Sequence, residues 1–310
     1  MLKFFKKLSN LLKKNEERKI INHLIAKHLP SRKINYNISQ NLFSNYKKEF
    51  LNSYLEDILP LAFRNLQLTK DFPKILDLGC GFAPMCLASK IYRDIWLKKK
   101  LTNEIYYVGL DIREDSINVN RKNFEKYKEI VFVHHKISNS KIDYVGDFLK
   151  YKQKSANYIT TDENSDGNEG NYKLPFLFKA DIQWSNSLIT HVTPQTLDNI
   201  LKFTYDHLDE NGVSLNTCNI IDPESLYLMK IGMADRNLKY DYGSFMTYNK
   251  TNPLVNTAYK IDHLHKVYKQ NKLKIIDIIP GKWRNIKNKN NPNNIYLDTI
   301  IAKKIITELV

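Results

Sequence analysis

The chain has 310 residues, of which 42% are hydrophobic and 26% charged, as in a globular protein with one large core or two modest ones. No apolar run approaches the ~20 residues that a membrane-spanning helix needs, and lysines interrupt the N-terminus too often for a secretory signal. The three cysteines lack the spacing of metal ligands, so we expect no metal site and a reducing, cytoplasmic setting.

The net charge of +15 admits three kinds of partner: nucleic acid, an anionic membrane surface or an acidic substrate. A composition rich in lysine and asparagine explains the charge equally well. The sequence contains no RNA- or DNA-binding module, and no basic run is interleaved with aromatic residues that could stack on bases. Nucleic acid is therefore not the expected partner.

Residues 1–14 have the pattern of a basic amphipathic helix, with apolar residues on one side and lysines over most of the rest. Such a helix can lie in a lipid interface at the inner face of a membrane, where each lysine contributes about 1 kcal/mol. It can equally pack on the protein's own core, and the sequence leaves both alternatives open. Further helical periodicity covers residues 16–29 and 41–67, with breaks at Pro30 and Pro60.

The stretch from Lys74 to Pro84 predicts a strand, a tight turn and a helix. Asp77 stands near the end of the short apolar strand, and Gly79 and Gly81 form the turn. Glycines let a ligand approach the backbone closely, and the N-terminus of a helix favours polar or anionic groups. This pattern begins a nucleotide-binding βαβ unit, although Pro84 stands where a dinucleotide fingerprint needs its third glycine or alanine.

A second apolar run, from Ile105 to Ile112, ends in the carboxylate of Asp111. An acidic residue at the tip of this strand can accept hydrogen bonds from both ribose hydroxyls of an adenosine, and we assign Asp111 this role. The alternative is that the glycines mark an ordinary turn and that Asp111 caps the next helix.

Strands and helices alternate along the remaining chain, which predicts an α/β fold. We expect a doubly wound, Rossmann-like sheet of seven mostly parallel strands, with helices on both faces and an antiparallel last strand. Pro194 begins a helix that Thr193 caps and that runs to about Leu208, with Asn211 and Gly212 as the residues that end it. The other expected elements are helices over 116–128 and 261–270, strands over 130–133, 213–218, 273–279 and 296–302, and the fourth strand with its following turn over 180–189. The predicted domains are an N-terminal helical segment over 1–70 and one domain over 71–310, with a mobile polar insertion at 138–173.

Three further stretches carry a family pattern. Residues 132–139 (FVHHKISN) are similar to F-x-H-x-D-V-x-N, and Asp181 with residues 187–192 (SLITHV) to S-F-D followed by S-V-F-T-H. Residues 281–284 (GKWR) with 298–300 (DTI) are similar to G-x-W-x-G-R and D-hydrophobic-V. Together with the glycine turn, they resemble class I S-adenosylmethionine-dependent methyltransferases, in particular a bacterial branch associated with polysaccharide and glycoconjugate biosynthesis. The resemblance implies S-adenosylmethionine as the cofactor.

The same resemblance implies which residues bind the cofactor. Its methionine end would lie over Gly79, Cys80 and Gly81, with Asp77 near its amine. Ser187, just past the fourth strand, would lie near the sulfonium and the methyl acceptor.

The adenine ring would be held by the backbone near Ile137 and by Ile112 on its face. Lys136 stands where the family has an acidic residue, and a lysine cannot accept the hydrogen bond of the adenine amino group. Asp143 or Asp147 could take its place, or the chain could be an inactive relative.

His191 is the candidate catalytic base, because imidazole titrates near neutral pH and the residue follows the fourth strand. The alternative is that it only bonds to backbone at the start of the Thr193 helix. Tyr240, Tyr242, Phe245 and Tyr248 are expected in an irregular segment that either covers the acceptor or buries its own rings.

We therefore expect a cytoplasmic methyltransferase that transfers a methyl group to a small-molecule or glycan-linked acceptor, with a hydroxyl as the methylated group. The chain has no Asn-Pro-Pro-Tyr-type motif after the fourth strand, which argues against methylation of nucleic-acid bases. The alternatives are an inactive methyltransferase-like scaffold and a protein or RNA methyltransferase.

Overall fold

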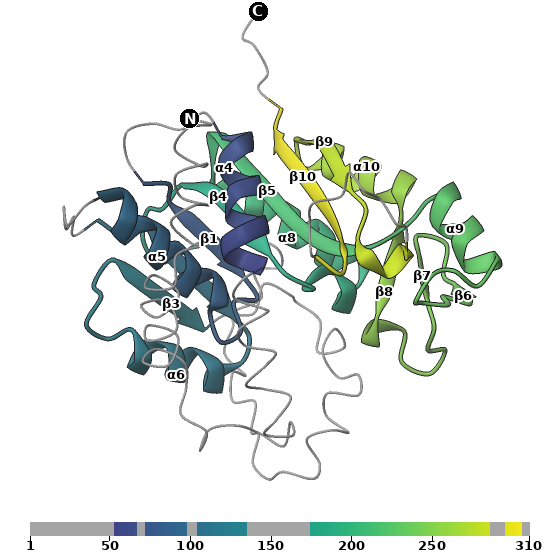
Figure 1. The fold of residues 1–310 in the computed structure, drawn as a ribbon, viewed down its shortest axis with the longest axis horizontal. Helices are drawn as coiled ribbons and strands as arrows, with labels where there is room; N and C mark the ends of the chain where they lie inside the picture. Colours follow the sequence, from purple (N-terminus) through teal and green to yellow (C-terminus); the bar gives the residue numbers. More distant parts are fainter. Residues whose placement is uncertain (1–52, 67–71, 98–103, 135–173, 286–294, 306–310) are drawn as a thin grey trace, which may run out of the picture. The chain divides into compact units, whose positions relative to one another are not determined.

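A computed structural model describes residues 53–66, 72–97, 104–134, 174–285 and 295–305 (Figure 1). The chain divides into two compact units, residues 1–135 with 292–294, and residues 136–291 with 295–310. The basic helix predicted at 1–14, the insertion at 138–173 and the domain boundary near residue 70 lie outside the described residues and stay predictions.

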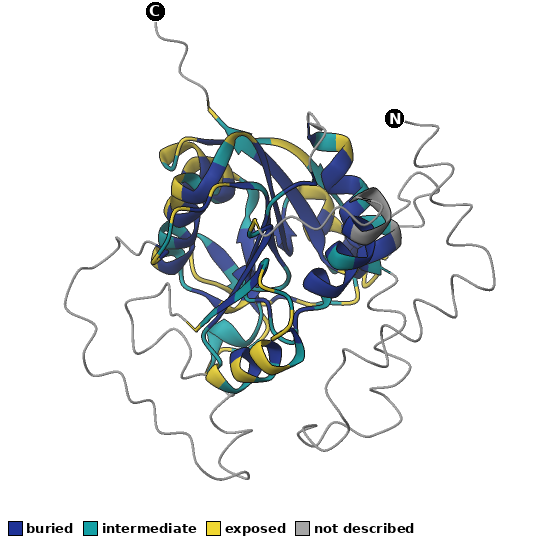
Figure 2. Cartoon of the chain, turned by 90° about the vertical axis from the view of Figure 1, so that its left-hand side faces the viewer, coloured by how far each residue is buried: buried dark blue, intermediate teal, exposed yellow. Residues whose placement is uncertain are grey.

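The first unit is a βαβαβ arrangement whose three strands are parallel. Asp77 of β1 pairs with Gly109 of β2, and Asp111 of β2 pairs with His134 of β3. Every residue of β1 and β2 is buried, as expected for strands covered on both faces (Figure 2). The elements are β1 (Ile75–Leu78), α5 (Pro84–Leu97), β2 (Tyr107–Asp111), α6 (Glu114–Asn123) and β3 (Ile130–His134).

The helix that precedes β1 changes type near the predicted break at Pro60. A π-helix, η2 (Tyr54–Ile58), runs directly into α4 (Leu59–Asn65), and Pro60 lies in the first turn of α4. Pro60 has no N–H to donate, and it follows Leu59, whose N–H still donates to the carbonyl oxygen of Tyr54 in η2.

The second unit is built around β5 (Leu208–Ile221), which is parallel to β4 (Ala180–Ser185) and β8 (Thr257–Lys260). The last strand, β10 (Asp298–Lys304), is antiparallel to β5 and to β9 (Leu273–Ile279), as predicted. The other elements are η3 (Ile189–His191), α8 (Pro194–His207), α9 (Pro223–Lys230), β6 (Tyr240–Asp241), β7 (Phe245–Thr247), η4 (Pro253–Val255), α10 (Ile261–Gln270) and η5 (Lys282–Arg284).

The α/β class with parallel strands and intervening helices is confirmed, but ten strands occur among the described residues instead of seven. Thr193 caps α8 as predicted, since its side chain accepts the N–H of Thr196. α8 ends at His207, which confirms the predicted end near Leu208, but Asn211 and Gly212 do not end the helix, because both lie inside β5. A Cβ at Gly212 would come within 2.9 Å of the Ala180 carbonyl oxygen, so glycine there permits close packing of β5 on β4.

The aromatic segment after α9 was predicted to be irregular. This prediction is wrong, because the segment contains two strands. β6 and β7 pair antiparallel around Gly243, which has a φ of +82°, and β7 pairs with β8. The ring of Phe245 is buried and stacks on the exposed ring of Tyr242. Within the described part of the chain, no helix is long and apolar enough to cross a membrane.

Candidate functional site in the first unit

The glycine turn after β1 is fastened to the end of β2 by backbone hydrogen bonds. The N–H groups of Gly79 and Cys80 both donate to the carbonyl oxygen of Leu110, at 2.8 and 2.9 Å. Gly79 and Gly81 have φ values of +72° and +52°, which glycine adopts without the steric cost that a Cβ would bring. The two glycines of the motif are therefore required by the shape of this turn.

The carboxylate of Asp111 completes the attachment of the turn. Its Oδ2 accepts the N–H of Gly81 at 2.8 Å, and its Oδ1 accepts the N–H of Arg113 at 2.8 Å. Arg113, not Asp111, is the N-cap residue of α6, and no side chain caps this helix. The alternative that Asp111 caps the next helix is therefore wrong, while its predicted contact with a ribose stays a prediction.

Asn120 of α6 also holds the turn, a role that was not predicted from the sequence. Its amide donates to the carbonyl oxygen of Gly81 at 2.7 Å and lies 3.9 Å from the sulfur of Cys80. Asn120 and Cys80 are both buried, and burial raises the pKa of the Cys80 thiol. Asn120 lies three residues after the buried Ile117, on the face of α6 that points to the sheet. A polar residue at a position of apolar periodicity was the available signal.

Asp77 is buried inside the unit and accepts a hydrogen bond of 2.5 Å from the hydroxyl of Tyr107. Burial raises the pKa of Asp77 to about 7, against the effect of the Tyr107 hydroxyl, and the negative charge of Asp111 raises it further. Tyr107 was missed, although it lies two residues before Gly109, the partner of Asp77, and so on the same face of the sheet.

The predicted adenine contacts are only partly described. Ile112 is half-buried, and its carbonyl oxygen lies 3.0 Å from Nε2 of His134 at the end of β3. Lys136 and Ile137 lie outside the described residues, as do Asp143 and Asp147, so their roles stay predictions.

In the second unit, the turn after β4 places Ser187 at a φ of +58°. The N–H of Ser187 donates to Oγ1 of Thr217 on β5 at 2.9 Å, and its carbonyl oxygen accepts the hydroxyl of Thr190 at 2.6 Å. A positive φ in a residue other than glycine persists only where its surroundings hold it. The hydrogen bonds to Thr217 and from Thr190 stabilise this conformation of Ser187.

His191 ends the short helix η3, and its Nδ1 lies 3.1 Å from the carbonyl oxygen of Leu254. Because a carbonyl only accepts, Nδ1 carries the proton and Nε2 keeps a lone pair. Burial of part of the ring lowers the pKa of His191, the Leu254 carbonyl opposes this, and the charge of Arg236 lowers the pKa further. The imidazole is therefore neutral at pH 7, which a base requires; its catalytic role stays a prediction.

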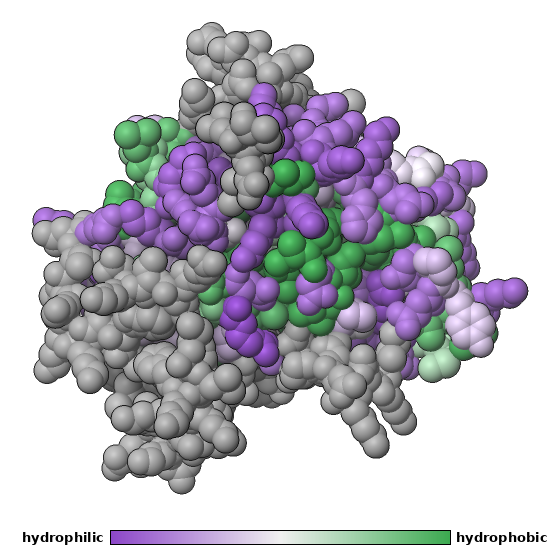
Figure 3. Space-filling view, turned by 90° about the horizontal axis from the view of Figure 1, so that it is seen from above, coloured by the Kyte–Doolittle hydropathy of each residue, from purple (hydrophilic) through white to green (hydrophobic). Residues whose placement is uncertain are grey.

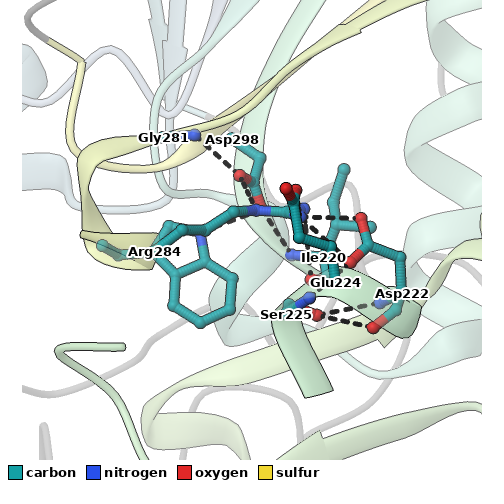
Figure 4. A network of polar contacts seen from close by, with 8 residues as sticks. Ile220, Asp222, Glu224, Ser225, Gly281, Arg284 and Asp298 are labelled. Carbon is teal, nitrogen blue, oxygen red and sulfur yellow. Dashed lines mark hydrogen bonds and ion pairs between the residues drawn. The ribbon is translucent and has the colours of Figure 1, made fainter. Parts of the chain in front are cut away.

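The motif at 281–284 forms a buried ion-pair network with Asp298 (Figure 4). The guanidinium of Arg284 binds Asp298 through Nε at 2.8 Å and Asp222 through Nη1 at 2.7 Å. Asp298 also accepts the N–H of Gly281 at 2.7 Å and the indole N–H of Trp283 at 2.9 Å. Since Asp222 is the N-cap residue of α9, the network joins the start of α9 to the start of β10. The contacts among these residues give the motif a structural role that requires no ligand.

Comparison with known proteins adds no family assignment. No known family's sequence profile matches the chain, and no curated protein matches it. An S-adenosylmethionine-dependent methyltransferase from Clostridium acetobutylicum is similar in structure, with 16% identity and a TM-score of 0.46 over 85% of this chain and 98% of that chain. DesVI of Streptomyces venezuelae has 11% identity and a TM-score of 0.49, over 87% and 100%. The glycopeptide N-methyltransferase MtfA complexed with S-adenosyl-L-methionine has 8% and 0.43, over 81% and 86%.

Among the described residues, no group of three or more His, Cys, Asp or Glu side chains could hold a metal ion. The candidate site in the first unit consists of the glycine turn, Asp77 with Tyr107, and Asp111 with Asn120.

The raised pKa of Asp77 predicts a specific pH dependence of stability. The pKa of Asp77 is about 7 in the folded protein and 3.8 ordinarily, so folding favours the protonated carboxyl. The contribution of this carboxyl to the free energy of unfolding is therefore complete below about pH 4 and is lost as the pH rises to about 7. We expect the free energy of unfolding of the wild type to fall, relative to Asp77→Asn, by up to about 4 kcal/mol across this window. Urea denaturation of both proteins measures the difference, and a difference independent of pH would contradict the assignment.

Arg284→Met is expected to lower the free energy of unfolding by about 3–5 kcal/mol, because it leaves the buried carboxylate of Asp298 without its cation. Lys274→Met removes a positive charge from an exposed position of β9 and is the matched control, expected to change little. Adding Asp298→Asn to Arg284→Met should restore part of the loss. If the single variant equals the control in chemical denaturation, the network does not stabilise the unit.

Proposed function

We propose that this protein is an S-adenosylmethionine-dependent methyltransferase that methylates a hydroxyl group of a small-molecule or glycan-linked acceptor. The observation that carries the proposal is the glycine turn held by Asp111 at the carboxyl ends of two adjacent parallel strands. Ligands of open α/β sheets bind outside the carboxyl ends of the strands, and the glycine turn and the carboxylate of Asp111 both lie there.

The residues of the turn fit the adenosine part of the cofactor. A carboxylate has about four acceptor positions, and each oxygen of Asp111 accepts one backbone N–H, so acceptor capacity remains for two ribose hydroxyls. Among the described residues other than the chain neighbours of Gly81, a Cβ at this position would meet only Nη2 of Arg113, at 3.9 Å. The described chain therefore does not pack tightly against this side of the turn.

Asp77 suits the amine of the methionine part. With a pKa of about 7, its ionised form is unfavourable alone, and a nearby ammonium group would stabilise that form. When bound, the cofactor supplies a methyl group on a positively charged sulfur. The protein then has to orient the acceptor and remove its proton.

His191 is proposed as the group that removes this proton. Its Nδ1–H is engaged with Leu254, and its lowered pKa keeps the Nε2 lone pair available near neutral pH. Ser187 is proposed to lie beside the reacting groups, since its turn is held rigidly by Thr217 and Thr190. We further propose polysaccharide biosynthesis as the setting of the reaction and contact with a membrane through residues 1–14.

Asp111→Asn is expected to weaken binding of S-adenosylhomocysteine about tenfold to a hundredfold, because two hydrogen bonds to a charged acceptor become weaker or are lost. Isothermal titration calorimetry measures the affinity. Glu114→Gln removes one negative charge from an exposed position in the first turn of α6 and is the control. Unchanged affinity in folded Asp111→Asn would remove the ribose assignment, and absence of any heat with the wild type would favour the inactive scaffold.

His191→Ala is expected to lower methyl transfer by about two to four orders of magnitude while leaving cofactor affinity unchanged, since general-base catalysis contributes that much. The assay follows methyl incorporation from labelled S-adenosylmethionine into glycan, small-molecule, protein and RNA fractions of a cell extract. His265→Ala changes an exposed histidine of α10 and serves as the control. Full activity of His191→Ala would retire it as the base, and label in protein or RNA alone would contradict the proposed acceptor class.

A further inference from the structure

Arg236, in the segment between α9 and β6, is a half-buried cation without an anionic partner. Its guanidinium carbon lies 5.1 Å from the centre of the Tyr296 ring, and this tyrosine is 43% exposed. Among the described residues, no carboxylate forms an ion pair with Arg236, and no acceptor takes a hydrogen bond from it. A guanidinium that is partly removed from water gains free energy from a counter-charge and from hydrogen-bond acceptors. The N–H donors of Arg236 are therefore left for water or for a ligand.

The carboxylates near Arg236 in the chain do not neutralise it directly. Both carboxylates at the start of α9 are ion-paired with Arg284, and Asp241 of β6 is ion-paired with Lys260. Asp235 is exposed and forms no ion pair with the arginine that follows it. Figure 3 shows hydrophilic and apolar side chains mixed at the end of the second unit where α9 and β6 lie. Recognition of a ligand there has to depend on individual groups, and a bound anion would supply the counter-charge that Arg236 lacks.

Residues 254–256, just before β8, connect the candidate base to β5. The carbonyl oxygen of Leu254 accepts the hydrogen bond from Nδ1 of His191, at 3.1 Å. The side-chain oxygen of Asn256 accepts the amide N–H of Asn219, at 2.7 Å. Asn219 lies near the carboxyl end of β5, so His191 is held close to that end as well.

Arg236 is held close to the same end of β5. Leu238, two residues after it, packs in a buried cluster with Ile221, the last residue of β5. Ile221 and Asn219 are two residues apart, so their side chains lie on the same face of the sheet. The segments that carry Arg236 and hold His191 therefore lie over one face at one end of this strand. Accordingly, the charge of Arg236 reaches the imidazole and lowers its pKa.

We propose that Arg236 recognises the methyl acceptor by an anionic group, a carboxylate or a phosphate, that the acceptor carries besides its hydroxyl. This assignment rests on the proposed methyl transfer, for which it names the substrate class. A guanidinium presents two parallel N–H groups to two oxygens of either anion, and such charge-assisted hydrogen bonds are stronger than neutral ones. The Tyr296 ring contacts the guanidinium but supplies none of the oxygen acceptors that an anion brings. An acidic acceptor also suits a chain with a net charge of +15, which attracts anions.

Isothermal titration calorimetry of the full-length protein, with S-adenosylhomocysteine in excess, tests the anion site without turnover. The probes are glucose 1-phosphate and glucuronate, and glucose is the uncharged comparison. At least one anionic probe is expected to bind more tightly than glucose, and which one binds distinguishes a phosphate from a carboxylate. Arg236→Gln should weaken this binding about tenfold to a hundredfold, as expected for lost hydrogen bonds to a charged group. Arg236→Lys keeps the charge without the paired N–H groups and should recover only part of the affinity.

The matched control is Lys239→Gln, which removes one positive charge from an exposed position of the same segment. Circular dichroism and thermal unfolding establish that all variants are folded. Three results would overturn the proposal: unchanged affinity of Arg236→Gln for the anionic probe, an equal loss in the control, or binding of glucose as tight as that of both anions. Weaker binding of S-adenosylhomocysteine itself by Arg236→Gln would assign the arginine to the carboxylate of the cofactor instead.

Methyl incorporation into a cell extract decides whether the anion belongs to the acceptor. The labelled product is expected to be retained by an anion-exchange resin, and Arg236→Gln should raise the KM for the acceptor at least about tenfold with a smaller effect on kcat. A labelled product that the resin does not retain would overturn the acceptor class. Absence of label with the wild type would refute the methyl transfer itself, and the titration would then decide only whether Arg236 binds anions.

Discussion

The hydrogen bond from the Gly81 N–H to the carboxylate of Asp111 is the interaction on which the first unit's candidate site depends. It joins the turn after β1 to the tip of β2, and Asn120 holds the other side of the same peptide through the Gly81 carbonyl. A turn with positive φ values would otherwise leave polar backbone groups unpaired in a mostly buried place. The same hydrogen bond also fixes the position of the Asp111 carboxylate, so it determines both the conformation of the turn and the place of its acceptor group.

The first unit places two buried carboxyl groups on one face of its sheet. Asp77 pairs with Gly109, which is two residues before Asp111, so both side chains emerge on the same side. Burial and mutual repulsion make the ionised form of Asp77 unfavourable, and its pKa rises to about 7. A site of this kind gains most from a ligand that brings a positive charge and hydroxyl groups, which is why a cationic nucleoside cofactor suits it.

In the second unit, by contrast, the buried charge of Arg284 is paired with carboxylates of the same chain. Arg284 is neutralised by Asp298 and Asp222, and the remaining acceptor capacity of Asp298 is filled by Gly281 and Trp283. A fully paired network of this kind needs no ligand and serves to hold elements together. Its effect is to fix α9 so that one face enters the core and the other stays in solvent.

The sequence by itself determined the βαβ start, the α/β class, the cap of α8 by Thr193 and the antiparallel pair at the end, because each follows from local periodicity, caps and glycine chemistry. It did not reveal Tyr107 beneath Asp77, Asn120 behind Gly81 or Asp222 opposite Arg284, since these pairs are 30 or more residues apart in the chain. It placed the end of α8 correctly near Leu208 but misassigned Gly212 as the residue that ends the helix. Glycine at this position of β5 instead permits the close approach of β4. Only the tertiary structure decides such contacts, because a side chain's partner and its pKa depend on which distant residues share its buried surroundings.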